Sequence, residues 1–310
     1  MYPKWKLIVQ SKWFVCLAFV LMSPVVVVAA DTPKVLFLGI DGCRFDALRK
    51  ANTPNLDRLI EQGIYADNTR IFHPRYTTAD TISGPGWSSI LTGVWADKHG
   101  VLDNQFKVSH YDKFPHFFAR VKEQSPELKT ASLICWAPID QYIVANADKR
   151  FSFTEKDYGK RDDAATDEAV KQLADESLDV MFLYLGATDE AGHASGFHPA
   201  NPQYVETIQA ADARIGRVLT AIQARSSFEN EDWLVVVTSD HGGKGTSHSN
   251  GHEVPEIYNS FLIVSGDAAQ RGKFDSDTYI VDAPATALKH LGIDASEDWQ
   301  LDGKPVGLKK

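Results

Sequence analysis

The sequence predicts an α/β protein: a three-layer α/β/α sandwich in which helices cover both faces of a central, mostly parallel β-sheet. Short apolar runs alternate along the chain with longer helical patterns, which is typical of a parallel sheet covered by helices. The runs are continuously apolar, as in KVLFLGI, DVMFLYL and WLVVVT, as expected for strands buried on both faces. Three of these runs are followed by aspartates, and this regularity indicates where a functional site lies.

The individual elements follow from the same patterns. We expect strands at Lys34–Ile40, Thr130–Cys135, Asp179–Leu185, Trp233–Thr238 and Phe261–Val264. Helices are expected at Thr53–Gln62, Trp87–Thr92, Phe114–Gln124, Ala164–Glu176, Pro202–Arg225 and Pro284–Leu291. The last of these helices precedes Gly292, a usual stop signal for a helix.

The first thirty residues have the pattern of a secretory signal peptide. Three lysines precede an apolar run over Trp13–Val28, and the small residues Ala29 and Ala30 follow. A retained membrane anchor is the alternative, but the run is shorter than the roughly 20 apolar residues of a comfortable span, and Pro24 interrupts it. We therefore expect an exported protein, periplasmic or extracellular and without a stable membrane anchor, in which residues 31–310 form one domain.

Charge and cysteine content narrow the range of partners. The net charge is −9 and becomes −12 without the three lysines of the first thirty residues. Binding to a nucleic-acid polymer is not expected, because such binding depends on basic patches. Only Cys43 and Cys135 follow residue 30. We expect both to be buried thiols, although one possible pair cannot be deduced from sequence.

Acidic residues follow three of the predicted strands. Asp41 ends the first strand, Asp189 comes shortly after DVMFLYL, and Asp240 with His241 follows WLVVVT. In open α/β sheets, ligands bind beyond the carboxyl ends of the strands. The sequence therefore predicts a cluster of carboxylates along one edge of the sheet.

The histidines near these aspartates indicate a metal site. Asp189 and His193 are four residues apart, so on a helical turn both side chains face one point, and this pair suits zinc. Asp240 and His241 are neighbours and can reach one metal only where the chain turns, which the two glycines after them permit. One of the later histidines, His248 or His252, is expected to complete the site of Asp189 and His193; His248 is favoured.

Ser83 is the candidate nucleophile. It stands before Gly84–Pro85–Gly86, which is expected to turn into a helix beginning near Trp87. Unpaired amide groups and the helix dipole favour an anion at such a position. The alternative is that Ser83 only caps the helix, the usual function of a serine there.

These segments together resemble the alkaline phosphatase superfamily and, within it, the type I phosphodiesterase/nucleotide pyrophosphatase family. FLGIDGCRFDAL resembles the opening strand with its first metal aspartate, and TPNLDRLIEQG resembles the helix after it. SGPGWSSILTGVWADKHGVLDN is similar to the nucleophile segment, GATDEAGH and TSDHGG to the later metal motifs, and IVDAPATALKHLGI to the closing helix. The resemblance covers nearly all of residues 31–310.

The resemblance implies a two-metal phosphohydrolase that cleaves phosphodiester or pyrophosphate bonds of a small substrate, a nucleotide or other phosphodiester. Two divalent ions, expected to be zinc, would be held by Asp41, Ser83, Asp240 and His241 on one side and by Asp189, His193 and His248 on the other. Ser83 would attack phosphorus and form a phospho-serine. His252 stays open as the last ligand, because the following SNGHEVPE departs from the family pattern.

Other departures keep further activities open. Serine replaces the usual threonine at Ser83, as in phosphatases, so a phosphomonoesterase is the first alternative; a phosphotransferase, a phosphonate hydrolase or a catalytically silent binding relative follow. Gly86 replaces an asparagine that donates to phosphate in the family, so the donor is sought in the backbone of Gly84 or Gly86, or in Asn104. Trp87 occupies the place of a sulfatase arginine, which argues against sulfate esters.

Overall fold

The computed structural model describes residues 31–73, 77–144 and 146–310. Residues Asp31–Lys310 form one compact unit. The predicted signal peptide lies outside the described residues, so its cleavage stays a prediction.

Among the described residues, eight strands form one sheet in the order β4-β3-β5-β1-β6-β7-β2-β8. Their bounds are β1 Thr32–Ile40, β2 Ile64–Arg70, β3 Lys129–Ile134, β4 Lys149–Ser152, β5 Leu178–Leu185, β6 Glu231–Thr238, β7 Asn259–Ser265 and β8 Gly272–Lys273. Strands β4, β3, β5, β1 and β6 pair in parallel, whereas β7 runs antiparallel to both β6 and β2. The predicted fold class, with a mostly parallel sheet, is confirmed.

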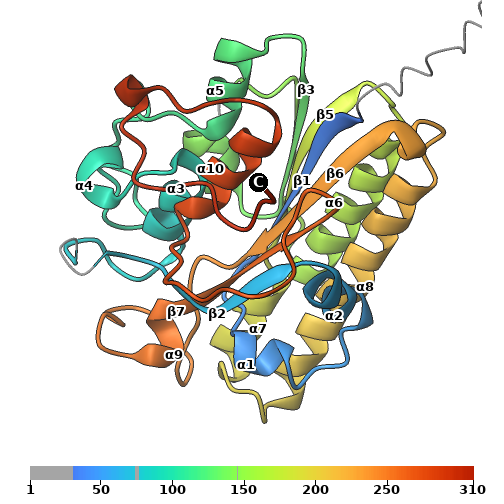
Figure 1. The fold of residues 1–310 in the computed structure, drawn as a ribbon. Coiled ribbons are helices and arrows are strands. Elements are labelled where there is room, and N and C mark those ends of the chain that lie inside the picture. The colour runs from blue at the N-terminus through green and yellow to red at the C-terminus, as the bar shows by residue number, and fades with distance from the viewer. Residues whose placement is uncertain (1–30, 74–76, 145) are drawn as a thin grey trace, which may run out of the picture. The chain divides into compact units, whose positions relative to one another are not determined.

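Helices cover both faces of the sheet (Figure 1). Those of eight or more residues are α2 Pro54–Gln62, α3 Ser83–Thr92, α5 Phe117–Gln124, α6 Tyr158–Leu173, α7 Ala187–Ser195, α8 Pro202–Gln223 and α10 Asp282–His290. The shorter ones are α1 Phe45–Leu48, α4 Ala96–His99 and α9 Pro255–Tyr258, with single turns at Ile139–Ile143, Phe228–Asn230 and Glu297–Trp299. Helices α3, α5 and α10 lie on one face, and α2, α6 and α8 lie on the other. The core consists of the buried central strands together with the helix side chains that pack on them from both layers.

The sequence missed three strands because of what stabilises them. Strand β2 reads IYADNTR, with polar residues at partly exposed positions. Strands β4 and β8 have only four and two residues. These three strands lie at or next to an edge of the sheet. Such strands are held largely by backbone pairing to their neighbours, and their side chains carry little apolar pattern.

The start of helix α3 corrects a prediction. The helix begins at Ser83 and not near Trp87, so Gly84–Pro85–Gly86 belong to its first turn. Proline fits there because the first helical residues donate no intrahelical hydrogen bond. The glycines permit close approach: a Cβ on Gly84 would lie 2.6 Å from the carbonyl oxygen of Asp103, and one on Gly86 would lie 2.9 Å from Cβ of Asp240.

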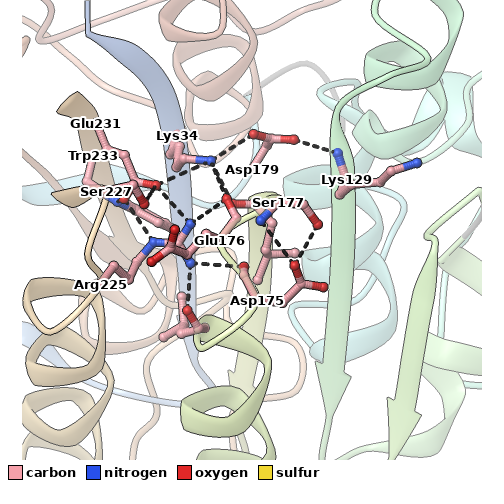
Figure 2. Close-up of polar contacts among 12 residues, drawn as sticks. Lys34, Lys129, Asp175, Glu176, Ser177, Asp179, Arg225, Ser227, Glu231 and Trp233 are labelled. Carbon is pink, nitrogen blue, oxygen red and sulfur yellow. Dashed lines mark hydrogen bonds and ion pairs between the residues drawn. The ribbon is translucent and has the colours of Figure 1, made fainter.

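Buried ion pairs join the amino ends of the central strands (Figure 2). Lys34 of β1 donates to Asp179 of β5 over 2.9 Å. Arg225, just after α8, makes a bidentate pair with Glu231 of β6, with both N–O distances 2.8 Å. Trp233 donates its indole N–H to the same carboxylate over 2.8 Å. Because every partner is itself hydrogen-bonded, the network fixes the relative position of these strands.

Removing the guanidinium from this network should be strongly destabilising. We expect Arg225→Ala to lower the free energy of unfolding by about 3–5 kcal/mol, because buried Glu231 loses its bidentate partner and keeps only Lys34, at 3.6 Å, as a counter-charge. The control is Arg217→Ala on α8, which removes a half-exposed pair with Asp167 and should cost less than about 1 kcal/mol. Urea unfolding curves of the two variants measure both values. Equal losses would contradict the structural role of the network.

Candidate metal centre

The carboxyl ends of three parallel strands bring the predicted acidic residues together. Asp41 follows β1 directly, and Asp240 and His241 follow β6 after one further residue. Asp189 lies in the first turn of α7, which begins two residues after β5. Strands β5, β1 and β6 are neighbours in the sheet, so their ends meet at the same edge.

The first group consists of Asp41, Asp240 and His241. One ligand atom from each lies within 4.8 Å of the other two. His241 Nε2 is 3.2 Å from Asp240 Oδ2 and 3.5 Å from Asp41 Oδ1. The hydroxyl of Ser83 lies 3.3 Å from the same nitrogen. The structure therefore brings the candidate nucleophile directly to this group.

The second group consists of Asp189, His193 and His248. The Nε2 atoms of the two histidines are 2.9 Å apart and lie 3.4 and 3.6 Å from the oxygens of Asp189. Each Nδ1 lies within hydrogen-bonding distance of a carbonyl, that of Thr246 for His193 and that of Thr81 for His248. An N–H at Nδ1 leaves Nε2 free as a ligand, the usual arrangement around a metal.

His252 lies apart from both groups. Its Nε2 is 2.9 Å from the carbonyl oxygen of Ala79, and its ring packs edge-on against Phe72. Of the two histidines that the sequence left open, the structure brings His248 to Asp189 and His193.

Three carboxylate oxygens at this edge lack a hydrogen-bond donor among the described residues. Asp41 Oδ1, Asp189 Oδ1 and Asp240 Oδ2 are buried and accept no hydrogen bond from any described residue. A buried, unsatisfied acceptor is costly and needs an explanation. Oxygen and imidazole nitrogen atoms in two compact groups are the ligand types that Zn²⁺ binds. The residues present therefore fit two divalent cations.

The negative charges of the three aspartates repel one another. Burial, aided by the charge of Asp189, raises the pKa of Asp41 to about 6. Burial and the charges of Asp41 and Asp189 raise the pKa of Asp240 well above its usual value. The hydrogen bond to Asp189 raises the pKa of His193 to about 9, whereas burial lowers that of His248 to about 3. A divalent cation would relieve the repulsion among these carboxylates.

Two side chains that the sequence analysis did not place here hold Asp41. Trp87 donates its indole N–H to Asp41 Oδ2 over 2.9 Å, and the hydroxyl of Tyr184 donates to the same oxygen over 2.5 Å. Both are buried. They bind one oxygen of Asp41 and leave the other facing the group. Trp87 is a core residue, and no local sequence signal links either side chain to Asp41.

A cavity of about 250 Å³ opens onto both groups. Besides the candidate ligands, its lining includes Asn104, Trp136, Tyr158 and Glu190. Arg44 is not among the lining residues: it is buried, donates to the carbonyls of Phe197 and Gly243 and pairs with Asp46. Its contacts hold the loop after β6 in place.

The remaining sequence predictions concern thiols and membrane segments. Cys43 and Cys135 are both buried and unpaired, as expected for structural thiols. Burial raises the pKa of each thiol. No helix among the described residues is long and apolar enough to cross a membrane.

The sheet order and the paired Asp/His groups at its carboxyl edge define an alkaline phosphatase-like α/β protein. Within this class, the chain belongs to the Type I phosphodiesterase / nucleotide pyrophosphatase family, whose model matches residues 35–271. The resemblance seen in the sequence motifs is thereby confirmed.

Three known proteins illustrate the relationship. Human ectonucleotide pyrophosphatase/phosphodiesterase family member 7 is 25% identical over 227 residues, which are 67% of this chain and 47% of that protein. Murine ectonucleotide pyrophosphatase/phosphodiesterase 5, solved as an inactive variant with AMP, has 15% identity and a TM-score of 0.65, covering 85% of this chain and 96% of that one. A phosphonate monoester hydrolase from Silicibacter pomeroyi has 15% identity and a TM-score of 0.65, with 88% and 76% covered. The chain spans about half the length of the curated relatives it matches.

The raised pKa of buried Asp41 predicts how the stability of the folded protein responds to pH. Its pKa in the folded protein, about 6, lies above its ordinary 3.8, so ionisation between these values costs the folded state stability. In metal-free protein, we expect the melting temperature of Asp41→Asn minus that of wild type to increase from pH 4 to pH 7 and then to level off. Thermal unfolding across this range measures it; a difference independent of pH would contradict the prediction. With zinc present the order should reverse, because the variant lacks a ligand oxygen.

Proposed function

We propose that the protein is an exported two-zinc phosphohydrolase that cleaves phosphodiester or pyrophosphate bonds through Ser83. The observation that supports this most directly is the position of the Ser83 hydroxyl. It belongs to the first residue of α3, lies 3.3 Å from His241 Nε2, and Ser83 lines the same cavity as Asp41 and the second Asp/His group. Family membership supports the same reaction class.

In this proposal, each ion has its own set of ligands. One ion would be held by Asp41, Ser83, Asp240 and His241, and the other by Asp189, His193 and His248. Two divalent ions in such a site supply charge stabilisation to the attacking and leaving oxygens of an in-line displacement. The unsatisfied oxygens of the three aspartates support this assignment.

The protein's own part in the reaction is nucleophilic. The oxygen of Ser83 attacks phosphorus, the new Oγ–P bond forms, and the bond between phosphorus and the leaving oxygen breaks. The leaving group departs as an alcohol or phosphate after taking up a proton. Water then attacks the phospho-serine, which releases the phosphate product and restores the Ser83 hydroxyl.

Asn104 is the best candidate for a donor to the phosphate. The backbone N–H of Gly84 donates to Asn104 Oδ1 over 2.6 Å, and that of Gly86 donates to the carbonyl of Ile82 over 3.1 Å. Both backbone donors that the sequence left open are thus engaged. The bond to Gly84 orients the amide of Asn104, which lines the cavity. Its nitrogen makes no hydrogen bond to a described residue, so it can donate to a phosphate oxygen.

A phosphomonoesterase at the same site is the second candidate. The presence of serine at position 83 favours it, because the resemblance to phosphatases is closest there. The murine relative binds AMP, which supports a nucleotide among the substrates to be tested. The ratio of rates on bis-(p-nitrophenyl) phosphate and p-nitrophenyl phosphate separates the two activities.

The nucleophile is tested by removing only its oxygen. We expect Ser83→Ala to retain zinc but to hydrolyse bis-(p-nitrophenyl) phosphate at least about a thousandfold more slowly, since covalent catalysis is lost. Ser83→Thr is the matched control, because it keeps a hydroxyl and should keep measurable activity. Full activity in Ser83→Ala with both metals bound would rule out the nucleophile assignment.

The metal ligands are tested by comparing two nearby histidines. His248→Ala should lose about half of the bound zinc, since one of the two groups is broken. His252→Ala should keep all of it, because its ring lies against Phe72 and away from both groups. Zinc per chain, measured by mass spectrometry after equal loading, gives the result. If His252→Ala lost zinc and His248→Ala kept it, His252 and not His248 would be the ligand.

A further inference from the structure

A second cavity, of about 300 Å³, lies toward the amino end of β6, whereas the metal centre lies beyond the carboxyl end of this strand. Its lining includes Trp233 and Val235 of β6. Val235 precedes Asp240 by five residues, roughly 15 Å at the rise of a strand. The two cavities share no lining residue. A cavity of this volume is large enough to hold a small organic molecule.

The interior of this second cavity is mainly apolar. Helices α2 and α8, which lie on the same face of the sheet (Figure 1), supply Leu59, Leu219 and Ile222 to its lining. Trp233 lies below them on β6, and all four side chains are buried. The half-buried ring of Phe228 completes the apolar part. An apolar group can therefore enter the cavity and be removed from water there.

The rim of the cavity is positively charged. Of the described residues that line it, Arg58, Arg271 and Lys309 are basic and Asp267 is acidic. Lys309 donates to the backbone carbonyl of Asp267 over 2.6 Å, which holds its ammonium group at the rim. The chain as a whole has a net charge of −9. A local excess of positive charge on an acidic chain favours a negatively charged ligand.

The two arginines of the rim differ from the other arginines of the protein. Neither Arg58 nor Arg271 makes a hydrogen bond, an ion pair or an aromatic contact with any described residue. Every other arginine within the described ranges makes at least one such contact. A guanidinium presents its N–H groups as a fork that matches the oxygens of a carboxylate or a phosphate. Two unpaired guanidinium groups thus face the same cavity.

A buried hydroxyl adds a donor in the floor of the cavity. Ser265, at the end of β7, is 2% exposed and lines the cavity. Its hydroxyl makes no hydrogen bond to a described residue. Ser265 pairs directly with Val235 across β6 and β7, so the two side chains lie on the same face of the sheet. Buried polar groups normally have a partner, and this hydroxyl can donate to a molecule in the cavity.

We propose that this cavity binds a small organic anion in which a carboxylate or phosphate head is joined to an apolar body. The head would pair with Arg58 and Arg271, and the apolar body would lie against Trp233 and Phe228. Charge complementarity at the rim and the unpaired hydroxyl of Ser265 support this ligand class over an uncharged one. The site is separate from the metal centre, so the inference does not rest on the proposed phosphohydrolase function.

The test uses three probes with the same aromatic body: 4-phenylbutanoate, 3-phenylpropylphosphonate and the uncharged 4-phenylbutanamide. None contains an ester, so binding is measured without turnover. Calorimetry on the wild-type protein gives the dissociation constants. We expect at least one of the two anions to bind at least about tenfold more tightly than the amide. The anion that binds more tightly identifies the head group.

The double substitution Arg58→Ala/Arg271→Ala should weaken binding of the preferred anion by at least about tenfold. Both side chains are exposed and unpaired, so this variant should keep the melting temperature of wild type. Ser265→Ala should weaken binding by about two- to tenfold, because one hydrogen-bond donor is lost.

Two controls locate the bound anion. Arg217→Ala removes an arginine of α8 that does not line the cavity, and it should leave binding unchanged. His248→Ala alters the metal centre and should also leave binding unchanged, since the two cavities are separate.

Four results would overturn the inference. Neither anion binds with a dissociation constant below about 1 mM, or the amide binds as tightly as both anions. Binding is unaffected by Arg58→Ala/Arg271→Ala, or it is lost in His248→Ala, which would assign it to the metal centre. Sedimentation of wild type and the double variant adds a further check. A dimer that only wild type forms would identify a second copy of the chain as the occupant and would also contradict the inference.

Discussion

The repulsion among three buried aspartates is the constraint on which the rest of the site depends. Asp41, Asp189 and Asp240 converge because three neighbouring parallel strands end at one edge of the sheet. Each has an oxygen that no described residue satisfies. Burying a carboxylate oxygen without a hydrogen-bond donor or a counter-charge costs free energy. The arrangement is therefore best explained as a binding site for cations.

The surrounding structure holds these acids in a geometry that they would not adopt alone. Trp87 and Tyr184 bind one oxygen of Asp41, and Asp240 accepts from the backbone N–H of Gly42. At the opposite end of the strands, the buried pairs of Lys34 and Arg225 fix the strand positions. Rigid strands with satisfied polar partners can therefore hold charged side chains close together at their other end.

The sequence by itself determined the central strands of the sheet and the residue types that gather at its carboxyl edge. Continuous apolar runs predicted the central strands, because burial on both faces requires such runs. The residue types after β1, β5 and β6 predicted two Asp/His groups, and the spacing of Asp189 and His193 predicted a shared helical turn. Apolar runs and the residue types after a strand are local properties, so a short window of sequence is enough to predict them.

Only the tertiary structure decided which distant residues meet. Nothing local distinguishes His248 from His252; the path of the loop after β6 brings one to Asp189 and the other to Ala79. The start of α3 at Ser83 depends on the space beside Asp103 and Asp240, and the contacts of Trp87 and Tyr184 with Asp41 span 46 and 143 positions of sequence. Contacts of this kind depend on packing between elements, which no window of sequence contains.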